Sequence, residues 1–109
     1  MEEYVANVNN NLNKYWKNFN FIVWGHLADG NLHLVAGVGD LQEKTIKKIE
    51  RSVYDPLELI GGSVSAEHGI GIEKKPYLHL SRTKEEINYM KKLKKTFDPK
   101  MILNPDLIF

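Results

Sequence analysis

The chain has 109 residues, a formal net charge of +1 and no cysteine, with 42% hydrophobic and 27% charged residues. These proportions are typical of a folded protein with one core and exclude a disordered chain. Without cysteine, disulfides and thiolate chemistry are excluded, and any metal would need His, Asp or Glu ligands. No concentrated basic face is evident, so no nucleic-acid partner is expected. The apolar runs are too short for a transmembrane segment, which predicts a soluble, cytoplasmic protein whose membrane association, if any, would come through a partner.

Apolar residues recur at steps of three and four over residues 3–17, which predicts a helix with one apolar stripe. Residues 19–27 and 31–38 are then rich in aromatic and β-branched side chains. The Asp29–Gly30 pair between them is a strong hairpin signal. The first part of the chain is therefore expected to be a helix followed by two antiparallel strands.

A second helical pattern follows Asp40 and continues toward Leu57. Pro56 lies inside this pattern and is expected to kink or interrupt the helix, with a break near Tyr54 and Asp55, because proline cannot donate the backbone hydrogen bond that a helix interior needs.

Residues 61–71, GGSVSAEHGIG, begin and end with glycine and show a short strand pattern at 63–66. A capping box at Thr83 and Glu86 then starts a last helix, which Asp98–Pro99 should end. The tail that follows is expected to be extended. The order helix, hairpin, helix, strand, helix and tail predicts an α+β fold, with an antiparallel sheet and helices packed on one face of it.

Two histidines, His26 and His33, are placed symmetrically about the Asp29–Gly30 pair. A two-residue turn would set them directly opposite each other, with Cβ atoms about 4.5–5.5 Å apart, from where two imidazoles can reach one ion. Glu67 and His68 are the next dense cluster of candidate groups. Adjacent strand residues point to opposite faces, so one of the two would ligate and the other would do something else. The same residues also fit half-buried cross-strand histidines and ordinary turn chemistry.

Three blocks carry a resemblance to a known family: GHLADGNLHL (25–34), GGSVSAEHGIGIEKKPYL (61–78) and FDPKMILNPDLIF (97–109). They occur in the order and approximate spacing seen in the C-terminal region of FAD-linked oxidases and dehydrogenases, which include D-lactate dehydrogenase, D-2-hydroxyglutarate dehydrogenase and the glycolate oxidase flavin subunit. The resemblance implies a ferredoxin-like cap-domain fragment. Residues 1–109 would form a single domain, the C-terminal part of the cap region, and the FAD-binding domain would be absent from the chain.

The resemblance also implies roles for individual residues. His26, His33 and Glu67 look like ligands of a divalent metal (zinc, manganese or iron), and His68 looks like the catalytic base. The metal would activate the hydroxyl of a small 2-hydroxy acid, the histidine would take its proton, and hydride would pass to FAD. Asn104 would lie near the flavin and Lys75 near the negative charge of the substrate.

Some positions depart from the family pattern. Val35 stands where metal-dependent members often have asparagine. Glycines of the pattern are replaced at three further positions, by Ala28, Met101 and Asp106. The chain is not expected to be active without a flavin-binding domain or subunit. Its large apolar residues suggest that it forms a homo-oligomer. The rival hypotheses are a non-catalytic remnant or interaction module that keeps the fold, and a small metal-binding protein unrelated to flavin chemistry.

Overall fold

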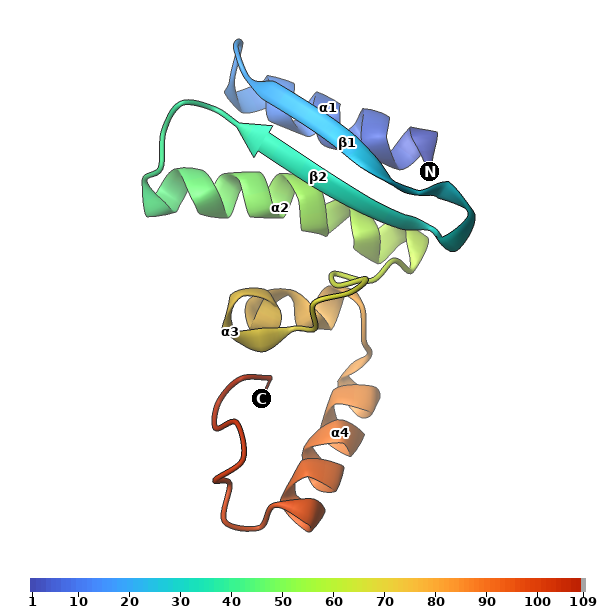
Figure 1. The fold of residues 1–109 in the computed structure, drawn as a ribbon, viewed down its shortest axis with the longest axis vertical. Coiled ribbons are helices and arrows are strands. Elements are labelled where there is room, and N and C mark those ends of the chain that lie inside the picture. The colour runs from blue at the N-terminus through green and yellow to red at the C-terminus, as the bar shows by residue number, and fades with distance from the viewer. Residues whose placement is uncertain (109) are drawn as a thin grey trace. The chain divides into compact units, whose positions relative to one another are not determined.

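The computed structural model describes residues 1–108, and the chain divides into two compact units, Met1–Ile60 and the part that begins at Gly61. The first unit contains α1 (Glu2–Tyr15), β1 (Asn20–His26), the 3-10 turn η1 (Leu27–Asp29), β2 (Asn31–Gly37) and α2 (Glu43–Ile60) (Figure 1). The second contains α3 (Gly71–Lys74), the 3-10 helix η2 (Lys75–Leu80) and α4 (Lys84–Phe97). These elements confirm the predicted α+β class. Among residues 1–108, no helix is long and apolar enough to cross a membrane.

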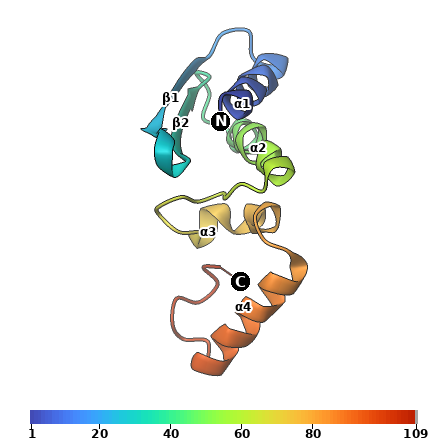
Figure 2. The same ribbon diagram turned by 90° about the vertical axis from the view of Figure 1, so that its right-hand side faces the viewer.

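In the first unit, β1 and β2 form an antiparallel hairpin, and α1 and α2 lie on the same face of it, as predicted (Figure 2). Successive strand residues point to opposite faces. The residues that face the helices are partly buried: Phe21, Val23, Leu32, Leu34 and Ala36. We call the opposite face the outer face; its positions are Asn20, Ile22, Trp24 and His26 on β1 and Asn31, His33, Val35 and Gly37 on β2.

The two helices of the first unit pack against each other through buried residues. Val8 and Leu12 on α1 are fully buried, and Leu57 on α2 is nearly so. The hydroxyl of Tyr4 donates a hydrogen bond to the Val53 carbonyl at 2.9 Å and so links α1 to α2. Burial, with a smaller contribution from Tyr54, raises the pKa of Tyr4 to about 12.

Helix α2 runs through Pro56 without a break, so the predicted interruption near Tyr54 and Asp55 is wrong. Proline at this position removes the N–H that would bond the Ser52 carbonyl one turn earlier. The Ser52 side chain is buried, and its hydroxyl donates to the Lys48 carbonyl at 2.8 Å. Leu57, directly after the proline, is buried, and this packing favours continuing the helix over breaking it.

In the second unit, the predicted strand at 63–66 is wrong, because residues 61–70 form an irregular loop. Serine side chains hydrogen-bond backbone groups of the loop itself: Ser63 donates to the Ser65 carbonyl at 2.8 Å, and Ser65 donates to the Gly69 carbonyl at 2.7 Å. Val64 is buried, and its N–H donates to the Ser81 hydroxyl at 2.8 Å. These bonds take the place of a strand ladder.

The predicted capping box of the last helix is confirmed. The Glu86 N–H donates to the Thr83 hydroxyl at 3.2 Å, and the Thr83 N–H donates to the Glu86 carboxylate at 2.7 Å. Helix α4 ends at Phe97, directly before Asp98–Pro99, as expected.

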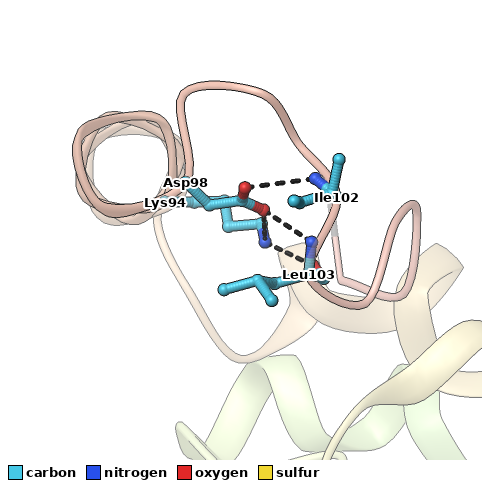
Figure 3. A network of polar contacts seen from close by, with 4 residues as sticks. All are labelled: Lys94, Asp98, Ile102 and Leu103. Carbon is cyan, nitrogen blue, oxygen red and sulfur yellow. Dashed lines mark hydrogen bonds and ion pairs between the residues drawn. The ribbon is translucent and has the colours of Figure 1, made fainter.

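After α4 the chain turns back toward α3 and is held by the buried carboxylate of Asp98 (Figure 3). This carboxylate accepts hydrogen bonds from Lys94 Nζ at 2.5 Å, from Ile102 N at 3.1 Å and from Leu103 N at 2.9 Å. Lys94 also donates to the Leu103 carbonyl. The Lys94 bond, with smaller contributions from the two amides, lowers the pKa of Asp98 below its usual range.

The tail is not extended as predicted. Met101, Asn104 and Asp106 have φ of 52°, 45° and 59°, in the left-handed region that favours glycine. Met101 and Asp106 are the two tail positions at which the family pattern has glycine. The tail therefore keeps a turned backbone that glycine would adopt without strain.

Candidate functional site

The two histidines of the hairpin are not directly opposite each other, so the predicted register is wrong. His26 pairs with Asn31, and His33 pairs with Trp24. The reason is the turn: η1 and Gly30, which has φ of 68°, replace the expected two-residue turn, and Gly30 N donates to the Leu27 carbonyl at 3.3 Å. The shift is an even number of residues, so both histidines remain on the outer face as diagonal neighbours, a relationship with a Cα separation of about 7–8 Å and a somewhat shorter Cβ separation.

The outer face holds the imidazole of His33 by stacking. The Trp24 and His33 rings have centroids 5.5 Å apart and planes only 11° from parallel. Trp24 and His26 are exposed, and His33 is partly buried. Trp24 was not among the sequence candidates, although its place two residues before His26, on the same strand face, is a signal that could have found it.

Gly25 fixes the geometry around His26. A Cβ atom at this position would lie 2.1 Å from the Asn31 carbonyl oxygen, and the backbone has φ of 151°. Only glycine allows the two strands to approach so closely here. The pairing of His26 with Asn31 therefore depends on Gly25.

Glu67 and His68 lie in the second unit, on the irregular loop. His68 Nε2 is 3.6 Å from a carboxylate oxygen of Glu67, and both residues are exposed. Their side chains interact because the loop lacks the alternation of a strand, so the expectation that they point to opposite faces is wrong. A carboxylate at this distance can orient an imidazole ring.

Lys75 and the tail that contains Asn104 are brought together within the second unit. Lys75 Nζ donates to the Asp106 carbonyl at 3.0 Å, two residues beyond Asn104. Asn104 is exposed. The ammonium group of Lys75 therefore lies beside the turned segment 104–106.

Within residues 1–108, the structure contains no group of three or more His, Asp or Glu side chains arranged to hold a metal ion. The first unit places two imidazoles, those of His26 and His33, on one face of the hairpin. Two imidazoles and one carboxylate, as in His26, His33 and Glu67, have the donor chemistry of a catalytic divalent site with open positions.

Comparison with known proteins shows the family. The domain family described as "FAD linked oxidases, C-terminal domain" matches residues 1–108. This chain belongs to that family.

Individual relatives agree with this assignment. The chain is 39% identical over 101 residues to a D-2-hydroxyglutarate dehydrogenase of Stutzerimonas stutzeri. The aligned region covers 88% of this chain and 22% of the relative. It is 44% identical over 82 residues to the D-2-hydroxyglutarate–pyruvate transhydrogenase DLD3 of Saccharomyces cerevisiae, covering 75% of this chain and 16% of the relative. Glycolate oxidase subunit GlcD of Bacillus subtilis is 37% identical over 89 residues, covering 79% of this chain and 19% of the subunit. The chain thus spans a fifth or less of two of these relatives and slightly more of the third.

Proposed function

We propose that this chain is the metal- and substrate-binding C-terminal portion of an FAD-dependent 2-hydroxy-acid dehydrogenase. The observation that carries the proposal is the placement of His26 and His33 on the outer face of the hairpin, in a chain of the FAD linked oxidase C-terminal family. The names of its relatives point to the same substrate class, since 2-hydroxyglutarate and glycolate are both 2-hydroxy acids. A flavin-binding domain or subunit would supply FAD.

In this proposal His26, His33 and Glu67 hold a divalent metal ion, which leaves coordination positions for the substrate. When bound, the metal would supply a Lewis acid for the substrate hydroxyl, and FAD would supply the hydride acceptor. The stack of Trp24 on His33 limits rotation of one ligand ring, and Gly25 keeps His26 in register.

His68 is the proposed base. Its exposed imidazole accepts the hydroxyl proton, and the Glu67 carboxylate, 3.6 Å away, can orient the ring. Neutral imidazole suits this task near neutral pH.

Lys75 and Asn104 complete the proposed site. The Lys75 ammonium attracts the substrate carboxylate, and its bond to the Asp106 carbonyl ties this positive charge to the tail. Asn104 offers an exposed amide to the flavin from the same segment. The bonds of Asp98 to Ile102 and Leu103 hold the start of that segment.

The test is replacement of His68 by alanine in the flavoprotein that contains this chain. Turnover on 2-hydroxy acids should fall by at least about a hundredfold, the usual contribution of a general base, while bound FAD is retained. The control is His79→Ala, since His79 is an exposed histidine on η2 with no assigned role. Retained turnover in His68→Ala, or a loss of FAD, would overturn the role given to His68.

A further inference from the structure

We infer that the 2-hydroxy acid used by this protein carries an apolar side chain, and that Ile22, Trp24 and Val35 on the outer face select it. The inference rests on the proposed function and adds the substrate class.

The outer face beside the histidines is apolar and accessible. Ile22, Trp24 and Val35 are 57%, 51% and 47% exposed, which is high for large apolar residues. None of the outer-face positions, all of which the structure describes, is Lys, Arg, Asp or Glu. The surface next to the proposed ligands thus offers van der Waals contact and no ionic partner.

The strand register makes this apolar surface continuous with the histidines. Trp24 lies directly opposite His33 and stacks on it, and Val35 lies opposite Ile22. Val35 is also the next outer-face residue after His33 along β2. A substrate held at the histidines would therefore extend its side chain from C2 over Trp24 and then over the Ile22–Val35 pair.

A second carboxylate on the substrate would be disfavoured on this surface. It would lose water against apolar side chains and would meet no cation of the outer face. An aliphatic side chain gains from the same contacts, and one methylene in an apolar site changes specificity by roughly tenfold or more. D-2-hydroxyglutarate has a second carboxylate, so the inference separates this chain from the relative named for that acid.

The experiment compares kcat/KM of the flavoprotein containing this chain for lactate, 2-hydroxybutyrate and 2-hydroxyisocaproate with the values for malate and 2-hydroxyglutarate. We expect kcat/KM to rise along the aliphatic series and to be at least about tenfold lower for the dicarboxylic acids. A preference for malate or 2-hydroxyglutarate would overturn the inference and leave the proposed function standing. An absence of turnover on all five acids would overturn the proposed function and the inference with it.

A variant ties the preference to the outer face. Val35→Lys replaces one member of the Ile22–Val35 pair by a cation and should move the preference toward dicarboxylic acids by about tenfold. Leu41→Lys is the matched control, because Leu41 is 89% exposed and lies outside the hairpin. An unchanged substrate preference in folded Val35→Lys would overturn the assignment. If that variant fails to fold, Val35→Thr provides the test, because it adds a hydroxyl at similar volume. It should lower kcat/KM for 2-hydroxyisocaproate more than for lactate.

Discussion

Trp24 and His33 face each other across the hairpin and stack, with ring centroids 5.5 Å apart and planes 11° from parallel. Trp24→Ala removes this stacking contact with the imidazole, so metal affinity should fall by about fivefold, which corresponds to an aromatic pair worth ~1 kcal/mol. Trp24→Phe should retain most of the affinity. Competition with a chromophoric chelator for zinc measures the effect. Equal affinity in Trp24→Ala and the parent chain would refute the positioning role of Trp24.

Alanine substitutions at Gly25 and Gly30 distinguish the cost of steric overlap from the cost of backbone strain. Gly25→Ala puts a Cβ 2.1 Å from the Asn31 carbonyl oxygen and should destabilise the hairpin severely, by about 3 kcal/mol or more. Gly30→Ala has open space around the new Cβ and carries only the cost of φ at 68°, about 1–2 kcal/mol. Urea unfolding followed by circular dichroism measures both. A Gly25→Ala variant as stable as Gly30→Ala would show that the strands can separate here at little cost.

The Asp98 carboxylate should titrate below the ordinary value of about 3.9 for aspartate, because Lys94 and two amides bind its charged form. A folded-state pKa below the unfolded one gives stability that is complete above pH of about 3.9 and is lost as the pH falls through the folded-state value. Lys94→Met should move the titration midpoint of Asp98 upward, as observed by NMR of the carboxyl carbon. Lys95→Met, which changes an exposed lysine of the same helix, should leave it unmoved.

An unmoved Asp98 midpoint in Lys94→Met would mean that Lys94 is not the main cause of the shift. In that case the tail would depend on the amides of Ile102 and Leu103 alone.

Tyr4 should make the first unit sensitive to alkali. Its pKa is raised to about 12 by burial, whereas unfolded tyrosine titrates near 10. The unfolded state therefore ionises first, so stability is complete below pH of about 10 and falls as the pH rises from there to about 12. Tyr4→Phe removes the bond to the Val53 carbonyl, costs about 1 kcal/mol at neutral pH, and should flatten this alkaline decline. Tyr89→Phe, at an exposed tyrosine, should leave the decline in place, and equal declines in both variants would contradict the account.

Local patterns predicted the parts of the fold that local physics determines. The aromatic and β-branched residues of β1 and β2 and the Thr83–Glu86 box need only neighbouring residues to act, and both predicted features are confirmed. Both histidines were correctly expected to share one face of the hairpin, because an even shift of register preserves the face.

The failures arise where another interaction outweighs the local pattern. The 3-10 turn at Leu27–Asp29 competes with the two-residue turn that Asp29–Gly30 indicates, and the composition of the strands does not choose between them. Packing of Leu57 favours a helix that continues past Pro56, and the hydroxyls of Ser63 and Ser65 close a loop where a strand was predicted.

The central claim is that His26 and His33 bind a divalent metal, with Glu67 as the third ligand. The most direct measurement is the metal content of the purified chain after equilibration with zinc, manganese or iron(II) and removal of the unbound ion. We predict about one ion per chain for the parent and none for the double variant His26→Ala, His33→Ala, with Glu67→Gln reduced and His79→Ala unchanged. Equal metal content in the parent and the double variant would contradict the claim.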